Sequence, residues 1–457
     1  MSRLGFILLA SLLALPAPAQ EFPKTQPFAP QTGPTATVDP SPSMQVLTLD
    51  EVISEALAKN PGMQSALHTV NAQQHKIPQA KSLADTMVSV GWNGNLTPFS
   101  VQEGDPSSYR GIAVSQQLPY PGKLKLRGRI AAKDADAAQW DYEAVRRRIV
   151  ADVKTAYYDY FFYDKALQIT RKDKDLLQKL SSISEARYRV GKGMQQDVLR
   201  SQVEITMLLQ RVTVLEQQRA TAQARLNAFM ARDPGAPLPP AANVEPTELN
   251  EKLDALYALA AKNDTSLQRE QQMAEKNQLA TQLAHKDYLP DFGVAYMYQQ
   301  RPNLPDMNGM TFTINVPVFY KTKQREEVRQ ATEETISAER SRDNRKNELQ
   351  FELKQDYLSA QASKQLLDLY SKAVVPQSSL ALESSMSAYE VGNVDFLTVL
   401  SNFSTILNYE VDYYRELANY QAALARMESL AGMELTSARQ VPMAEGTPRT
   451  EGARNHE

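Results

Sequence analysis

The sequence predicts a mostly α-helical protein with a small β part, built as two similar halves. Two long polar stretches lack strong helix breakers over most of their length, and four short stretches alternate apolar with small polar residues. The chain also resembles itself when it is shifted by roughly 200 residues. These observations predict long coiled-coil helices, four strands and an internal duplication.

The N-terminus has the pattern of a secretory signal peptide over residues 1–19. A basic residue precedes the apolar run Leu4–Leu15, and Ala17-Pro18-Ala19 matches a small-residue cleavage site. We therefore expect a mature chain that leaves the cytoplasm and begins near Gln20. Residues 20–46 are rich in proline and predict an extended leader. Because the sequence contains no cysteine, neither a disulfide nor a lipidated cysteine is available to it.

The first long helix is predicted over 123–189, which holds no proline and one glycine, Gly128. A helix of that length spans about 100 Å and needs partner helices along most of it. The second long helix, over 321–389, carries Pro376, which predicts a bend. Apolar residues of the first recur at spacings of four and three, the period of a left-handed coiled coil: Ile149, Val153, Ala156, Tyr160, Tyr163, Leu167 and Thr170.

The two halves are predicted to hold the same elements in the same order. Tyr188-Arg189-Val190-Gly191 recurs as Tyr389-Glu390-Val391-Gly392, and the helices that follow keep the same apolar register. The other helices are expected at about 48–84 and 195–231 in the first half, and at about 249–287 and 396–433 in the second. The predicted parts are a first repeat (47–232), a Pro-rich linker (233–247), a second repeat (248–435) and a polar, disordered tail (436–457).

Four stretches alternate apolar and small polar residues with the period of a strand. Such alternation fits a half-buried sheet in a soluble domain, but it also fits membrane strands that face lipid on one side and water on the other. Each stretch has about 9–11 residues, the length of a tilted membrane strand, and no later apolar run is long enough for a transmembrane helix. Four strands cannot close a barrel, so several chains would have to contribute. The apolar positions are Val88, Val90, Trp92 and Leu96; Ile112, Val114 and Leu118; Phe292, Val294, Tyr296 and Tyr298; and Phe312, Ile314, Val316 and Val318.

Composition disfavours nucleic-acid binding and catalysis. The net charge is −3, and no phosphate-binding loop, nucleophile elbow or histidine-rich cluster is present. His68 with His75, and Met307 with Met310, are weak metal-site candidates that surface or packing roles explain as well. We therefore expect no enzyme, no cofactor and no metal site. The aromatic residues 157–163 are interpreted as helix packing.

Basic residues gather where each long helix follows a strand. They include Lys123 and Lys125 in the first half and Lys321 and Lys323 in the second. Cations at a helix N-terminus oppose the helix dipole, so another attraction is expected to favour them. Anionic lipid headgroups, a cationic collar facing a lumen and a solvated helix face all remain open.

Long paired helices, two strand pairs, the duplication and the Tyr-x-x-Gly turns together make the chain resemble the TolC-like outer-membrane efflux proteins over about 47–435. The segment Gln117–Leu124 is similar to a stretch of the heavy-metal (CzcC-like) branch. The resemblance implies a homotrimer in the cell outer membrane, in which four strands from each chain complete a 12-stranded β-barrel. It also implies that the helices form an α-barrel across the periplasm. A periplasmic adaptor protein and an inner-membrane pump of the resistance-nodulation-division type are the implied partners.

The same resemblance implies roles for particular residues. The turns at Val190-Gly191 and Val391-Gly392 correspond to the periplasmic tips that meet the adaptor. Thr398 and Ser401 stand where relatives carry inward-facing acids, so the usual acids of the entrance ring are absent at these two positions. Asp197 and Asp395 are the nearby carboxylates, and each is expected either to set the charge of the entrance or to cap a helix.

The function expected from the sequence is passive exit of solutes, driven by the pump. Two alternatives remain at this point. An exit duct for type I protein secretion would have the same fold, and a non-conducting periplasmic coiled-coil scaffold would share the helices but would not need a lipid-facing sheet.

Overall fold

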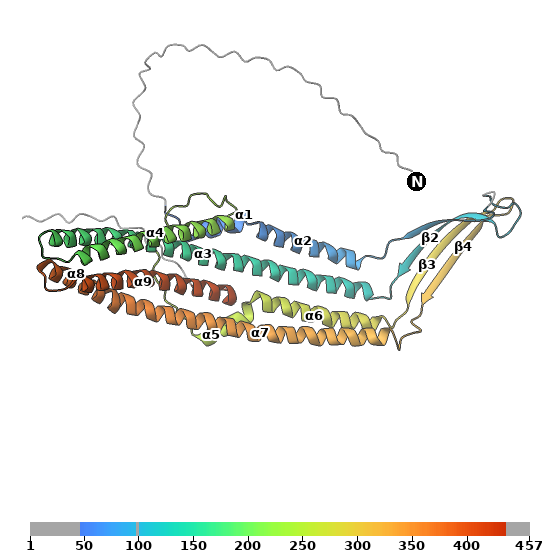
Figure 1. The fold of residues 1–457 in the computed structure, drawn as a ribbon. Helices are drawn as coiled ribbons and strands as arrows, with labels where there is room; N and C mark the ends of the chain where they lie inside the picture. Colours follow the sequence, from blue (N-terminus) through green and yellow to red (C-terminus); the bar gives the residue numbers. More distant parts are fainter. Residues whose placement is uncertain (1–45, 97–99, 436–457) are drawn as a thin grey trace, which may run out of the picture. The chain divides into compact units, whose positions relative to one another are not determined.

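The computed structural model describes residues 46–96 and 100–435 (Figure 1). The predicted signal peptide, almost all of the predicted leader and the predicted tail lie outside these residues. The described helices are α1 (Leu49–Lys59), α2 (Pro61–Lys81), α3 (Lys123–Arg189), α4 (Gln195–Phe229), α5 (Leu253–Asn263), α6 (Thr265–Lys286), α7 (Gln324–Leu369), the π-helical segment η1 (Tyr370–Val374), α8 (Val375–Val391) and α9 (Phe396–Ala431). The strands are β1 (Met87–Asn93), β2 (Tyr109–Leu118), β3 (Asp291–Gln300) and β4 (Met307–Asn315).

The first helix of each half is divided in two, where the sequence pattern predicted one continuous helix. Asn60 ends α1 and caps α2 by accepting a hydrogen bond from the backbone N–H of Gly62 at 2.8 Å, and Pro61 is the first residue of α2. Asp264 divides α5 from α6 in the same way, since its side chain accepts from the N–H of Leu267 at 2.7 Å. Both breaks place a side-chain cap where the chain turns, and a proline at the first helical position supports the first break.

Helix α3 packs against helices of both halves of the chain. Its 67 residues contact α2, α4, α6 and α9, which are the partner helices that its coiled-coil period requires (Figure 1). Within residues 157–163 five aromatic side chains are buried and Tyr163 is partly buried. Tyr157 and Tyr160 also donate hydrogen bonds to the carbonyls of Leu47 and Pro239, at 2.9 and 3.1 Å. The interpretation of residues 157–163 as packing is therefore confirmed.

The second long helix is interrupted before Pro376, as its sequence suggests. The interruption is η1, a single π-helical turn between α7 and α8. Pro376 has no backbone N–H to donate to the carbonyl one turn earlier, and a π bulge absorbs such a missing bond. The first long helix has no proline and stays α-helical throughout.

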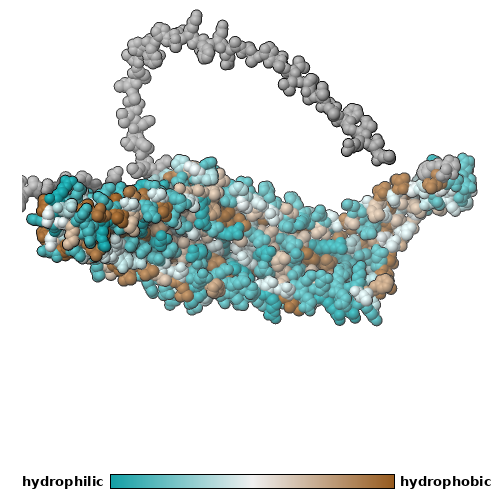
Figure 2. All heavy atoms as spheres, in the orientation of Figure 1, coloured by the Kyte–Doolittle hydropathy of each residue, from teal (hydrophilic) through white to brown (hydrophobic). Residues whose placement is uncertain are grey.

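The four strands form one antiparallel sheet in the order β1-β2-β3-β4. Its register brings the predicted apolar positions onto one face, with Val90 opposite Ile112 and Ile112 opposite Tyr298. This face is open: Val90 is 84% exposed and Phe312 is 72% exposed. Brown hydrophobic surface over the strands contrasts with the mostly teal surface of the helices in Figure 2.

Two details of the predicted strands are wrong. The strand β4 ends at Asn315, so Val316 and Val318 lie in the connection to α7, and Leu96 lies beyond the end of β1. Met307 and Met310, the weak metal-site candidates, both belong to β4, and their spacing of three residues puts them on opposite faces of the sheet. They therefore cannot act together as a pair of ligands. Among the described helices, none combines the length and the apolar character that a membrane span requires.

Candidate functional site at the helix tips

Two turns link the long helices to the helices that follow, one in each half. In the first, Gly191 adopts φ +71° after α3, and in the second Gly392 adopts φ +84° after α8. The residue after each glycine bonds back into its helix: Lys192 N–H donates to the Arg187 carbonyl at 2.8 Å, and Asn393 N–H donates to Ala388 at 2.9 Å. Both are glycine-ended helix caps of the Schellman type, which is the local structure expected from the Tyr-x-x-Gly pattern.

The side chain of Arg187 joins the two turns. Its guanidinium donates to the backbone carbonyls of Tyr389 and Glu390 in the second turn, the latter at 3.0 Å, and to the carbonyl of Lys192 in the first at 3.2 Å. Its Cζ atom also lies 4.7 Å from the centre of the Tyr389 ring, within the range of a cation–π interaction. We call this arrangement the Arg187 clasp.

Tyr389 fills the space between the turns. It is 2% exposed, and its ring packs edge-on against Phe396 of α9 with centroids 5.6 Å apart. Burial raises the pKa of the Tyr389 hydroxyl, the nearby charge of Asp197 raises it further, and the cation of Arg187 opposes the shift. Asp197 therefore lies close to the second turn although it belongs to the first half.

The structure separates the roles of the two predicted acids. Asp395 is the N-cap of α9 and accepts a hydrogen bond from the N–H of Thr398 at 2.9 Å. Hydrogen bonds from Thr398 hold the pKa of the Asp395 carboxyl below its usual range. Asp197 lies inside the first turn of α4, whose N-cap is Met194 without a side-chain bond, so Asp197 is not a cap. Ser401 and Thr398 are exposed on α9.

Exposed apolar side chains surround the two turns. They include the predicted docking residues Val190 and Val391, and beside them Met194, Leu199 and Leu397. Hydrophobic surface is visible in Figure 2 at the end of the molecule that holds α8 in Figure 1. An exposed apolar patch beside two rigid turns is a surface suited to protein contact.

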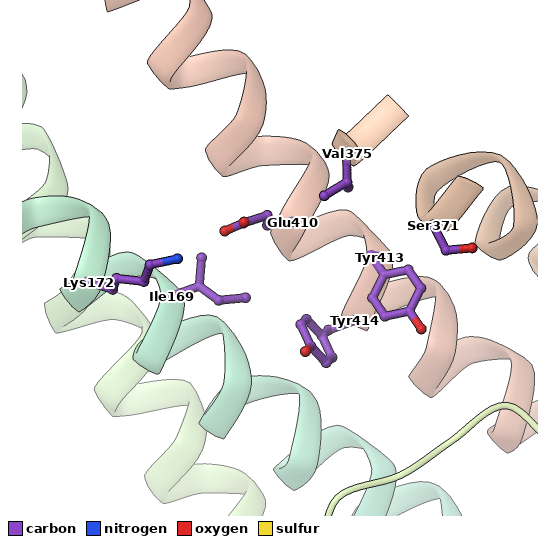
Figure 3. A pocket seen from close by; sticks show the side chains of 7 residues that line it. All are labelled: Ile169, Lys172, Ser371, Val375, Glu410, Tyr413 and Tyr414. Atoms are coloured by element: carbon purple, nitrogen blue, oxygen red, sulfur yellow. The ribbon is translucent and has the colours of Figure 1, made fainter. Parts of the chain in front are cut away.

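A cavity of about 330 Å³ opens beside the π segment, where α3, η1 and α9 meet (Figure 3). Lys172 and Glu410 line it from α3 and α9, with Tyr413 and Tyr414 below them. The adjacent Asp173 is buried, and burial together with the charge of Glu410 raises its pKa to about 6, against the opposing charges of Lys172 and Arg211. In the described part of the chain, no group of three or more histidine, aspartate or glutamate side chains could hold a metal ion.

Sequence reasoning identified the turns but missed the Arg187 clasp. Arg187 immediately precedes the first Tyr-x-x-Gly motif, and the second copy has Ala388 at the equivalent position. That difference between the copies is the only sequence signal for the clasp. Nothing local to Arg187 indicates that its partners lie more than two hundred residues later.

Comparison with known proteins shows which proteins the chain is similar to. The family model described as outer membrane efflux protein matches residues 52–232. Protein CyaE of Bordetella pertussis is 25% identical over 206 residues, which are 44% of this chain and 43% of CyaE. The chain thus matches less than half the length of this curated relative.

Solved structures match over most of the chain. CusC superposes with a TM-score of 0.73 at 15% identity, covering 84% of this chain and 92% of CusC. The outer membrane protein VceC from Vibrio cholerae gives 0.72 at 15% identity, covering 85% and 97%. The open state of the MtrE outer membrane channel of Neisseria gonorrhoeae gives 0.70 at 14% identity, covering 86% and 91%. At these identities the likeness is one of fold.

Proposed function

Residues 52–232 match the outer membrane efflux protein family, as the sequence resemblance indicated, and from this premise we propose that the chain is one subunit of a trimeric outer-membrane exit channel. In this proposal three copies place their sheets in the outer membrane and their helices in the periplasm. Solutes leave passively through the common lumen, and the energy comes from an inner-membrane pump reached through a periplasmic adaptor.

The observation that carries the proposal is the sheet. One face is predominantly apolar and largely exposed, with Gln116 as a polar exception on β2, while the other carries small and polar residues such as Ser89, Ala113 and Thr311. The outer strands β1 and β4 each pair on one side only within the described chain. Unpaired strand edges are costly in lipid, so pairing of β4 with β1 of the next copy would satisfy both edges at once. Three copies of four strands give the 12 strands of the family's barrel.

The tips are the proposed docking end. Each long helical path leads away from the sheet, through α3 or through α7, η1 and α8, and ends at one of the two turns. An adaptor would contact the apolar surface around Val190-Gly191 and Val391-Gly392. Asp197 is the acid we propose to set the charge of the entrance, because Asp395 is already engaged as a cap.

Among the alternatives, the sheet disfavours the non-conducting scaffold, because an exposed apolar sheet face has no role in a soluble coiled coil. A duct for protein secretion would use the same fold with a different pump. The cargo would separate these two, since a secretion duct must restore export of a protein and an efflux channel must restore resistance to a small solute.

The test of the membrane assignment is a pair of arginine substitutions at neighbouring positions in β4. Ile314→Arg places a charge on the apolar face, where a midplane arginine costs about 2–4 kcal/mol per copy. Thr313→Arg places the same charge on the polar face, which we assign to the water-filled lumen. We expect Ile314→Arg to abolish membrane-inserted trimer and Thr313→Arg to preserve it, measured by membrane fractionation and unheated gel electrophoresis. Normal insertion of Ile314→Arg would overturn the assignment.

A further inference from the structure

The two connections from strand to long helix have similar composition but differ in burial and in ion pairing. In the first, Lys123 is buried, its side chain only 3% exposed, and it binds Asp287 and Asp291, each at 2.9 Å. Asp291 also accepts from the N–H of Tyr120 at 2.7 Å. This connection is therefore closed by its own ion pairs, and its first lysine is used inside the fold.

The second connection, residues 316–323, is largely exposed. Phe319 is 78% exposed, and Val316 and Val318 are also largely exposed. The segment is nevertheless ordered by its own backbone, because the N–H groups of Thr322 and Lys323 both donate to the Phe319 carbonyl, at 3.1 and 3.0 Å. Its apolar side chains are therefore exposed to solvent on a turn with regular backbone hydrogen bonds.

These apolar residues follow the lipid-facing positions of β4 in the sequence. Ile314, Val316 and Val318 follow one another at the two-residue spacing of that face, although the strand itself ends at Asn315. Beyond them Tyr320 packs near Tyr288, with ring centres 6.4 Å apart. Aromatic side chains at the end of an apolar band are typical of the level where membrane meets water.

Positive charge follows at once. Lys321 and Lys323 are exposed, and neither forms an ion pair with any described residue. The Nζ atom of Lys321 lies 6.0 Å from the centre of the Tyr320 ring. The acid next along the chain, Glu326, is bound by Arg325 and Arg329, at 3.0 and 3.1 Å, and does not reach back to the lysines.

From this juxtaposition we infer that residues 316–323 form a binding surface for anionic phospholipid, with Val318 and Phe319 among the acyl chains and Lys321 and Lys323 at the headgroup phosphate. The inference rests on the proposed membrane position of the sheet and adds the lipid class that it contacts. Lysines near an anionic surface each contribute about 1 kcal/mol, or roughly a fivefold gain in affinity. The first connection lacks the equivalent exposed aromatic, and of its two lysines Lys123 binds Asp287 and Asp291 while Lys125 alone is exposed.

The test measures lipid binding to the full-length trimer in detergent by native mass spectrometry, with phosphatidylglycerol as anionic probe and phosphatidylethanolamine as zwitterionic probe. We expect wild type to prefer phosphatidylglycerol, and the double variant Lys321→Gln/Lys323→Gln to bind it about 25-fold more weakly, from fivefold per lysine. The control Lys179→Gln/Lys262→Gln removes the same charge from exposed sites elsewhere on the helices and should leave the preference unchanged. Inorganic phosphate at the same concentration should not compete.

Equal phosphatidylglycerol affinity in wild type and in the Lys321→Gln/Lys323→Gln variant would overturn the inference. A second readout places photoreactive benzoylphenylalanine at position 319. A lipid adduct supports the surface, whereas a covalent link to a neighbouring copy would show that protein covers it and would also overturn the inference. Both readouts start from inserted trimer, so a protein that never inserts instead contradicts the proposed function.

Discussion

The two tip turns have the same backbone conformation but differ in the side chains that surround them. Gly191 lies in open space, where a Cβ would meet no heavy atom within 4 Å, whereas a Cβ on Gly392 would lie 3.2 Å from a guanidinium nitrogen of Arg187. Tyr188 is 45% exposed, whereas its counterpart Tyr389 is buried beneath the same guanidinium. The duplication thus supplied two copies of one turn, and a single arginine of the first copy now holds the second.

This asymmetry concerns what stabilises each turn and not how exposed it is, since Val391 beside the second turn is as exposed as Val190 beside the first. The first turn is rigid through its own helix cap and leaves Tyr188, Val190 and Met194 exposed. The second turn depends on a contact from the other half of the chain. A change that loosens the Arg187 clasp should therefore act on the second turn and leave the first nearly intact.

The largest effect is expected from Arg187→Ala. It removes hydrogen bonds to three carbonyls and the contact with the Tyr389 ring, and we expect the local opening free energy of residues 389–394 to fall by about 2 kcal/mol. Hydrogen exchange of that segment should accelerate by roughly 30-fold, with a smaller change at 188–193. Arg187→Lys keeps the charge but not the guanidinium group, so its exchange rate at 389–394 should lie between those of wild type and Arg187→Ala. Equal acceleration in both turns would contradict the asymmetry.

A smaller effect is expected from alanine at the two glycines. Both positions have positive φ, which costs a residue with a side chain about 1–2 kcal/mol. Gly392→Ala should cost more than Gly191→Ala, because only its Cβ meets Arg187. Thermal unfolding of the two variants, compared with wild type in the same detergent, gives the difference directly. The reverse order would mean that the guanidinium moves aside without loss.

The smallest structural effect is expected at the two acids. Asp395→Asn keeps a capping side chain and should leave stability unchanged at neutral pH, whereas Asp395→Ala should lower it. Because the pKa of Asp395 is lowered, its ionised form stabilises the folded state above the ordinary aspartate pKa, and that contribution is lost as pH falls through the folded value. The difference in thermal stability between wild type and Asp395→Ala should therefore become smaller as the pH is lowered.

Asp197→Asn tests the charge of the entrance without removing a helix cap, since Asp197 is not a cap. We expect it to reduce cation selectivity in planar-bilayer conductance more than Asp395→Asn does, because three inward carboxylates would be neutralised. If selectivity falls only with Asp395→Asn, the capping acid also sets the entrance charge. Unchanged selectivity in both variants would leave neither acid as the entrance charge.

Local sequence signals predicted much of this fold. The absence of proline predicted that α3 is continuous, and the glycines Gly122 and Gly191 marked its two ends. Two-residue alternation placed Val90, Ile112 and Tyr296 on one sheet face. The divisions at Asn60 and Asp264 were overlooked although a capping residue followed by Pro61 signals the first of them. The end of β4 before Val316 was hidden because apolar alternation continues into the turn.

The candidate site was less predictable for a physical reason. The turns follow from glycines at fixed positions, and these are local properties of the chain. The Arg187 clasp and the nearness of Asp197 to Tyr389 arise from tertiary packing between the two halves, which no local pattern encodes. The capping role of Asp395 was one of two interpretations that the sequence left open, and the hydrogen bond to Thr398 supports it.

Pairing of β1 with β4 of the next copy is the central claim, and disulfide trapping tests it most directly. The chain has no cysteine, so the background is empty. Ser89→Cys in β1 is combined in turn with Gly309→Cys, Thr311→Cys or Thr313→Cys on the same face of β4, and Phe312→Cys on the opposite face serves as control. Oxidation of cells carrying the protein in the outer membrane should give linked dimers and trimers, and nothing larger, for at least one of the three pairs. Absence of links in all three, with the protein present in that membrane, would contradict the account.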